Sequence, residues 1–149
     1  METVNYKAIQ LNQYPFQSTD KIRYADTDRQ GHVNNAVFNQ FFETGRIELL
    51  YNPMEPLYAD GCSFVIANLK ADYLAEIKWP GIVYIGTGVV RIGNSSLHLV
   101  QGIFQDDKLV ALGETVIVQV ENQTSKSKIS SQHAKHKLTT YLIENIKGI

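Results

Sequence analysis

The chain has little cysteine, no long apolar run and no excess of charge of either sign. Its 149 residues include one cysteine, Cys62, so no disulfide can form within the chain, and a reducing cytoplasm is the expected compartment. No apolar stretch approaches the roughly 20 residues that a membrane-spanning helix needs. No basic, apolar and small-residue segment typical of a secretion signal opens the chain. We therefore expect a soluble cytoplasmic protein with no membrane partner.

The formal charge of -1 also excludes a class of partners. Lysines and arginines are scattered along the chain, and a nucleic-acid backbone is normally bound by clustered ones. Apolar residues make up 44% of the sequence and charged residues 19%, as in a folded globular protein. The length is that of one domain, so residues 1–149 are predicted to form a single domain that does not bind nucleic acid.

Several common catalytic motifs are missing. Serine hydrolases of the nucleophile-elbow type need Gly-x-Ser-x-Gly, and the nearest segment, residues 61–64, lacks the glycines in register. Residues 86–88 read Gly-Thr-Gly but lie in a predicted strand, so they form no dinucleotide-binding motif. No metal or other cofactor is expected, because no histidine shows ligand spacing with a cysteine or a carboxylate. The histidines are His32, His98, His133 and His136.

The first half of the chain predicts a strand, a loop and a helix. Residues 17–24 mix polar and β-prone side chains, and residues 25–31 are charged or turn-forming. Asn34 and Asn35 then supply side-chain oxygens that can cap a helix, which we expect from Asn35 to about Leu50, before Asn52-Pro53. The spacing of three and four residues places one set of side chains on the buried face. That set is Phe38, Phe41, Phe42, Gly45 and Leu49.

Gly45 is an unusual member of this apolar face. Glycine costs a helix about 1 kcal/mol relative to alanine. Its presence indicates that another element approaches too closely for a Cβ atom. We expect a sheet to cross the helix there.

The second half of the chain predicts an antiparallel meander. Beyond Gly61 the pattern has a period of two, and turn-forming segments divide the residues that follow into further strands. A polar linker over residues 121–129 and a C-terminal helix over about 130–146 complete the chain outside a core of about 17–120. The predicted fold class is α+β, with a five-stranded antiparallel sheet wrapped around one long helix. The predicted strands after the first are Val65–Tyr73, Ile82–Ile92, Ser96–Gln105 and Leu109–Val120. In the first of these, the residues expected on one face are Val65, Ala67, Leu69, Ala71 and Tyr73.

One segment carries a resemblance to a known family. Residues 22–35 read Ile-Arg-Tyr-Ala-Asp-Thr-Asp-Arg-Gln-Gly-His-Val-Asn-Asn, which resembles the signature of the 4-hydroxybenzoyl-CoA thioesterase family. Phe41-Phe42-Glu43 and Arg46 extend the match, and a looser likeness covers about residues 17–120. The resemblance implies the hotdog fold and an acyl-CoA thioesterase, which hydrolyses an acyl thioester to a carboxylic acid and free CoA.

The resemblance places the catalytic carboxylate on Asp28 and gives Asp26 a role in shaping the loop. Such a carboxylate acts either as a general base on water or as a nucleophile, and the sequence does not choose between them. Aspartates in loops often only accept hydrogen bonds from nearby backbone, which is the structural alternative for Asp28. The backbone N–H of Asn35, at the helix start, is the predicted oxyanion donor.

Other residues are candidates for substrate binding. His32 could orient water or substrate, and Asn34 lies at the helix cap. The phenylalanines near the helix start are expected to line an acyl tunnel. The phosphates of CoA are expected at a predicted hairpin turn, although a turn alone also explains those residues. The candidates are His32, Asn34, Phe38 and Phe42 for the acyl side, and Arg91, Asn94, Ser95 and Ser96 for the nucleotide.

Two further expectations concern partners. Glu43 and Arg46 are three residues apart on the helix and are expected to form an ion pair. A sheet wrapped on one helix leaves an open edge, so a homodimer or homotetramer is expected.

The alternatives are a non-catalytic acyl-CoA binding module and an acyl-ACP thioesterase. A hydratase or dehydratase acting on acyl thioesters is disfavoured, because it would resemble a different motif with a histidine paired to an acid.

Overall fold

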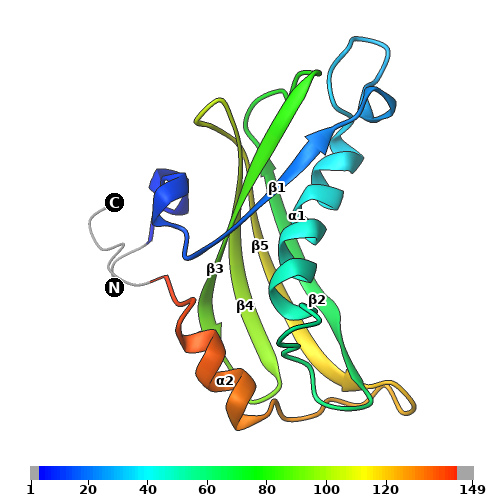
Figure 1. Cartoon of the computed structure of the whole chain (residues 1–149), viewed down its shortest axis with the longest axis vertical. Helices are drawn as coiled ribbons and strands as arrows, with labels where there is room; N and C mark the ends of the chain where they lie inside the picture. Colours follow the sequence, from blue (N-terminus) through cyan, green and yellow to red (C-terminus); the bar gives the residue numbers. More distant parts are fainter. Residues whose placement is uncertain (1–3, 144–149) are drawn as a thin grey trace.

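The computed structural model describes residues 4–143 and has one antiparallel sheet with a long helix across one face (Figure 1). The five strands lie in the order β1-β3-β4-β5-β2. The predicted α+β architecture is therefore confirmed. The strands are β1 (Phe16–Ile22), β2 (Cys62–Tyr73), β3 (Gly81–Ile92), β4 (Ser96–Gln105) and β5 (Lys108–Glu121); the α-helices are α1 (Asn35–Leu50) and α2 (Gln132–Thr139); short 3-10 turns are η1 (Tyr6–Ala8), η2 (Leu11–Gln13) and η3 (Tyr24–Asp26).

Helix α1 has the bounds that the sequence predicts. The Oδ1 atom of Asn34 accepts a hydrogen bond from the N–H of Ala36 at 3.0 Å, which caps the helix. A Cβ atom on Gly45 would lie 2.7 Å from Nε2 of Gln101 in β4, so the predicted close crossing of helix and sheet is confirmed. Phe42 packs in the same way on Gly113 of β5 and is 1% exposed. The core thus fills the space between α1 and the sheet.

Strand β2 departs from the predicted period of two. A β-bulge lies between Ile66 and Asn68, so Ile66 and Leu69 both face the helix side, and Val65 faces the other side. The prediction that Val65 shares a face with Leu69 is therefore wrong. An extra residue in one strand reverses the alternation, and a simple period-two pattern carries no signal for it.

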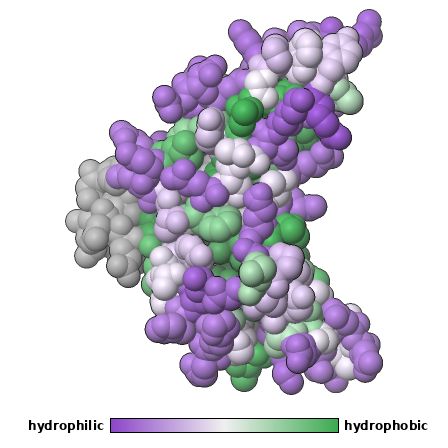
Figure 2. All heavy atoms as spheres, viewed as in Figure 1, coloured by the Kyte–Doolittle hydropathy of each residue, from purple (hydrophilic) through white to green (hydrophobic). Residues whose placement is uncertain are grey.

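Strand β2 is also an open edge of the sheet. Its apolar residues on the helix side stay exposed, with Ile66 51%, Leu69 40% and Tyr73 44% accessible. The strands in the middle of the sheet, such as β4, are mostly buried instead. On the face of the molecule shown in Figure 2, hydrophobic surface lies among largely hydrophilic residues. The apolar surface of β2 is therefore available to another molecule.

The sheet face opposite α1 is covered by the N-terminal segment. Tyr14 packs on Gly86 of β3 and edge to face on Phe104 of β4. Burial raises the pKa of Tyr14, and its hydroxyl has no hydrogen-bond partner among the described residues. Ile9 and Leu112 belong to the same cluster. Both faces of the sheet are thus packed.

The C-terminal helix is shorter than predicted. Helix α2 ends at Thr139, and residues 144–146 of the predicted helix lie outside the described residues. Tyr141 and Ile143 instead pair with β3, since the N–H of Val89 donates to the carbonyl of Tyr141 and its carbonyl accepts from Ile143. Hydrogen bonds to the sheet replace those of a further helical turn. Within residues 4–143, no helix is long and apolar enough to cross a membrane.

Candidate active site

The loop between β1 and α1 is held by the first aspartate of the Asp-Thr-Asp segment. Asp26 is 3% exposed, and its carboxylate accepts from the backbone N–H of Arg23 at 2.8 Å and from its guanidinium at 2.9 Å. The carbonyl of Asp26 also accepts from the N–H of Asn34, at the helix cap. Asp26 therefore joins the end of β1 to the start of α1, which is the loop-shaping role expected for it.

Asp28 is exposed and only partly engaged by its own loop. Its Oδ1 atom accepts from the N–H of Gln30 at 2.8 Å and from that of His32 at 3.3 Å. Its Oδ2 atom has no hydrogen-bond donor within the described part of the chain. The loop thus fixes the carboxylate by one oxygen and leaves the other available for chemistry.

The start of α1, which follows this loop, presents a backbone donor. The capping oxygen of Asn34 serves Ala36, and the carbonyl of Asn34 accepts from Val37. In residues 4–143 the N–H of Asn35 has no acceptor in the protein. As the first residue of a 16-residue helix, it also lies at the positive end of the helix dipole.

Asp28 and Asn35 line one pocket of about 360 Å³. The pocket lies between the loop, the start of α1 and the segment that follows β2. His32 also lines it, with Nε2 3.2 Å from Oε2 of Glu76. The full lining comprises Asp28, Gln30, His32, Val33, Asn35, Phe38, Tyr73, Leu74, Ala75 and Glu76.

The two predicted tunnel phenylalanines have different positions. Phe38 lines the pocket and contacts Tyr73 edge to face, with ring centroids 5.3 Å apart. Phe42 lies one turn further along α1, buried on Gly113, and is not among the lining residues. Phe38 and Tyr73 therefore form the apolar wall of the pocket, and Phe42 belongs to the core.

The predicted nucleotide residues lie at the other end of the sheet. Gly81, at the start of β3, pairs with Ile22 beside the Asp28 loop, whereas Asn94 and Ser95 follow the end of β3. The 12 residues of β3 separate the two ends by roughly 35 Å, at about 3.3 Å per residue. Within one chain, the structure does not bring Arg91, Asn94, Ser95 and Ser96 to the pocket.

The expected ion pair of Glu43 and Arg46 is not formed among the described residues. Arg46 is 7% exposed and donates from Nη1 to Oε1 of Gln101 at 3.3 Å. Burial lowers the pKa of Arg46, and the charge of Glu43 opposes this change. Gln101 also donates to the Phe42 carbonyl and to Thr87. Arg46 thus forms a hydrogen bond with the sheet and not the ion pair with Glu43 that their spacing on the helix suggested.

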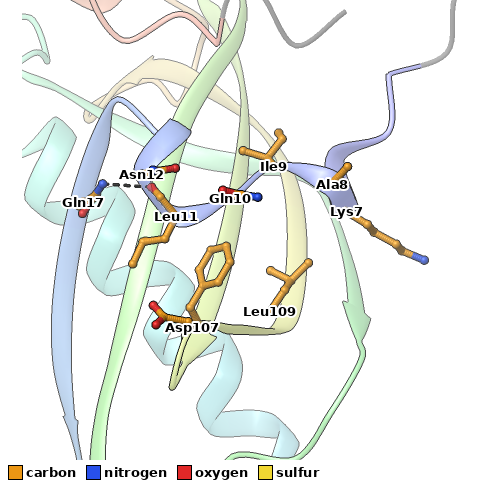
Figure 3. A pocket seen from close by; sticks show the side chains of 10 residues that line it. Lys7, Ala8, Ile9, Gln10, Leu11, Asn12, Gln17, Asp107 and Leu109 are labelled. Carbon is orange, nitrogen blue, oxygen red and sulfur yellow. Dashed lines mark hydrogen bonds between the residues drawn. The ribbon is translucent and has the colours of Figure 1, made fainter. Parts of the chain in front are cut away.

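A larger hollow of about 520 Å³ lies elsewhere (Figure 3). Leu11 of the N-terminal segment and Phe104 of β4 both line it, and Gln17 donates to the Leu11 carbonyl. It opens on the sheet face opposite α1. Its lining includes one carboxylate, Asp107, but no residue from the start of an α-helix that could donate a backbone N–H to an oxyanion. Size alone therefore does not mark the active site.

No metal site is evident in the part of the chain that the structure describes, where no group of three or more histidine, cysteine or acidic side chains is placed to hold an ion.

Solved structures share this architecture. A protein from Pseudomonas aeruginosa strain PAO1 is 26% identical with a TM-score of 0.79, over 89% of this chain and 95% of that one. A predicted thioesterase from Bacillus stearothermophilus is 29% identical with a TM-score of 0.77, over 85% and 96%. A thioesterase from Thermus thermophilus, complexed with coenzyme A and Zn, is 27% identical with a TM-score of 0.73, over 84% and 98%. The fold and pocket define the class of hotdog-fold thioester hydrolases, as predicted.

The sequence defines the family more closely. A model of the thioesterase-like superfamily matches residues 22–138, and the chain belongs to this superfamily. The acyl-CoA thioester hydrolase YbgC of Escherichia coli O6:H1 (strain CFT073) is 26% identical over 115 residues, which cover 74% of this chain and 86% of the relative. The family expected from the Asp-Thr-Asp segment is confirmed.

Sequence reasoning missed part of the pocket wall. Glu76 and Ala75 come from the segment after β2, and they reach the pocket because Val33 donates to the Ile77 carbonyl at 2.9 Å. Residues so far apart in the chain leave no local pattern. The sequence offers one signal for this wall, Tyr73, a large aromatic residue at the end of the predicted strand.

Proposed function

We propose that this chain hydrolyses acyl-CoA thioesters, with Asp28 as the catalytic carboxylate. The observation that carries the proposal is an aspartate whose Oδ2 atom is unengaged among the described residues, in one pocket with an unpaired helix N–H. Asp28 acts as a general base on water or attacks the thioester directly. The relatives named as acyl-CoA thioester hydrolases support CoA as the carrier.

The N–H of Asn35 is the proposed oxyanion donor. Charge develops on the thioester oxygen during attack, and a preorganised donor at the positive end of a helix stabilises it. Removal of one such donor typically lowers kcat by about 10² to 10³-fold. Asn34 positions this donor through its cap, so we assign it a structural role near the substrate.

His32 is proposed to position the substrate or the attacking water. Its bond to Glu76 fixes the ring at the edge of the pocket. This pair also favours a second candidate, a hydratase acting on acyl thioesters, because a histidine paired to an acid can deliver water to a double bond. The two reactions differ in products: hydrolysis releases a thiol, whereas hydration leaves the thioester intact.

The test compares Asp28→Asn with the unchanged protein in a thiol-release assay over a panel of acyl-CoAs. The variant keeps the size of the side chain and loses its basicity, so kcat should fall at least about 10²-fold while KM changes little. Asp60→Asn, an exposed carboxylate outside the pocket, is the matched control. Equal turnover in Asp28→Asn and in the unchanged protein contradicts the assignment.

We also propose that the protein acts in the cytoplasm as a homodimer formed at the free edge of β2. The exposed residues Ile66 and Leu69 continue onto α1 through Ile47, which is 46% exposed. An edge-to-edge pair buries these side chains and satisfies the open backbone groups of β2. In such a pair the two sheets run in opposite directions. The hairpin formed by residues 91–96 of one subunit would then lie toward the Asp28 end of the other subunit, where it would reach the substrate.

Sedimentation velocity tests the dimer. The unchanged protein should sediment as a dimer, and Leu69→Glu should shift it to a monomer, because the charge would be buried at the interface. Asn68→Glu, on the other face of β2, is the control and should stay dimeric. A monomeric unchanged protein at micromolar concentration would overturn the proposal.

A further inference from the structure

Two exposed aromatic rings stand next to the loop that carries Asp28. Tyr24 and Trp79 contact edge to face, with centroids 5.3 Å apart and planes inclined by 70°. Tyr24 is 74% exposed and Trp79 45% exposed. Single exposed aromatic residues need no explanation, whereas a contiguous exposed apolar patch marks a binding surface. Ile82 and Tyr84 follow Trp79 in the chain, share one face of β3 and are 51% and 42% exposed.

Positive side chains lie next to the aromatic pair in the sequence and in the strand register. Arg23 precedes Tyr24, Lys78 precedes Trp79, and Lys21 lies opposite Ile82 in the β1–β3 register. Within residues 4–143, Lys21 and Lys78 form no ion pair. Arg23 contacts Asp26 through Nη2, and its side chain is 66% exposed, so its other donors face solvent. Aromatic rings beside cations can bind a nucleotide, because a base stacks on the ring and phosphates pair with the cations.

Three of the acidic residues at this end of the sheet have partners of their own, whereas Asp106 and Asp107, in the β4–β5 turn after Gln105, form no ion pair among the described residues. The carboxylate of Asp20 accepts from the Thr44 hydroxyl on α1, and that of Asp26 accepts from Arg23. Glu76 is bound to His32 at the pocket. Lys78, next to Trp79 in the chain, is thus left without an acidic partner among the described residues, and Arg23 shares its charge with Asp26.

The pair lies within reach of the reacting carboxylate. Asp28 is the fourth residue after Tyr24, and a fully extended chain covers at most about 3.6 Å per residue, so the two Cα atoms lie within roughly 15 Å. An isolated antiparallel β-bridge between His32 and Lys78 joins the segment before Trp79 to the same loop. The pantetheine arm of coenzyme A is long enough to span such a distance. The hairpin at Asn94 lies at the far end of the sheet in the same chain.

We infer that Tyr24 and Trp79 hold the adenine of the acyl-CoA substrate, with Arg23 and Lys78 beside its phosphates. This inference rests on the proposed thioesterase function and gives it a nucleotide subsite. The aromatic pair recognises the carrier and takes no part in the chemistry at Asp28.

Kinetics with two carriers test the inference. Trp79→Ala should raise KM for an acyl-CoA about tenfold or more, since stacking of one base on an aromatic ring contributes on this scale. KM for the same acyl group on pantetheine, which lacks the nucleotide, should not change, and kcat should be unchanged for both. Tyr58→Ala, the exposed member of an aromatic pair at the other end of the sheet, is the matched control. Equal changes for both carriers, or none, overturn the inference.

Fluorescence gives a second readout that does not depend on hydrolysis. Trp79 is the single tryptophan of the chain, so its emission reports on this site alone. Adenosine 3′,5′-bisphosphate should quench it with saturation, and Tyr24→Ala should weaken that binding while leaving the folded state intact. Saturable quenching without thioester hydrolysis supports the nucleotide site and counts against the proposed function. Hydrolysis that depends on Asp28, without quenching, overturns the nucleotide site alone.

Discussion

The two ends of the sheet are built from similar parts, and only one of them forms a candidate active site. Each end has a capped helix start, at Asn34 for α1 and at Ser131 for α2. Each has a histidine 3.2 Å from a glutamate, His32 at one end and His133 at the other. Figure 1 shows α2 at the opposite end of the molecule from the start of α1.

The difference lies in what faces each helix start. The first N–H of α1 opens onto a pocket with the available oxygen of Asp28. Neither helix has an acidic residue in its first turn, and at α2 the nearby Glu55 is shared between His133 and Lys137 in a solvent-exposed contact. A helix terminus or a histidine-acid pair is therefore no site by itself. The candidate site depends on the chain path that places a carboxylate in one pocket with an unpaired donor.

Proline substitution at the first residue of each helix is the most direct test of the difference between the two helix starts. Proline fits the first helical position and removes only its N–H. The preceding residues, Asn34 at ψ 139° and Ser131 at ψ 157°, have the extended backbone that proline requires. Asn35→Pro should lower kcat about 10² to 10³-fold, because the oxyanion donor is lost. Gln132→Pro should leave turnover within about twofold of the unchanged protein in the thiol-release assay, because that helix start faces no substrate.

Unfolding measurements separate this result from a structural fault. Both proline variants should unfold at denaturant midpoints close to that of the unchanged protein. A loss of activity that follows a loss of stability would assign Asn35 to the fold and not to the chemistry. Equal activity in Asn35→Pro and the unchanged protein would remove the oxyanion role.

A smaller effect is expected from the buried carboxylate of the same loop. Asp26→Ala leaves the backbone N–H of Arg23 without its acceptor, which should reduce the free energy of unfolding by about 1 to 3 kcal/mol. Glu55→Ala, at the other end, removes exposed contacts and should cost less than about 1 kcal/mol. Urea denaturation followed by circular dichroism measures both. Similar losses at the two sites would show that Asp26 does not organise its loop.

Much of the fold follows from local patterns. Helix α1 begins and ends as predicted, because a capping asparagine and a proline mark its ends and apolar spacing marks its face. Strands β3 to β5 lie within one residue of their predicted bounds, since turn-forming residues separate them. The bulge in β2 and the early end of α2 were not predicted. Both depend on hydrogen bonds to distant strands, and such bonds leave no periodic signal in the segment itself.

The candidate site was predicted in part. One pocket is lined by four of the predicted residues, Asp28, Asn35, His32 and Phe38. The Asp-Thr-Asp segment pointed to Asp28. The role of each residue in catalysis stays a prediction until the variants are measured. The hairpin residues could not be placed, because their separation from the loop depends on the direction of β3.

Local sequence accounts for the helix, the order of strands along the chain and the loop with two aspartates, because capping, turn formation and apolar periodicity act between near neighbours. The packing of distant segments sets the rest: Asp26 is buried while Asp28 lines a pocket, and Arg46 bonds to Gln101 in place of Glu43. Burial and partner choice depend on which strands pack against a side chain. Those strands are distant in the chain, so the local sequence does not encode their approach.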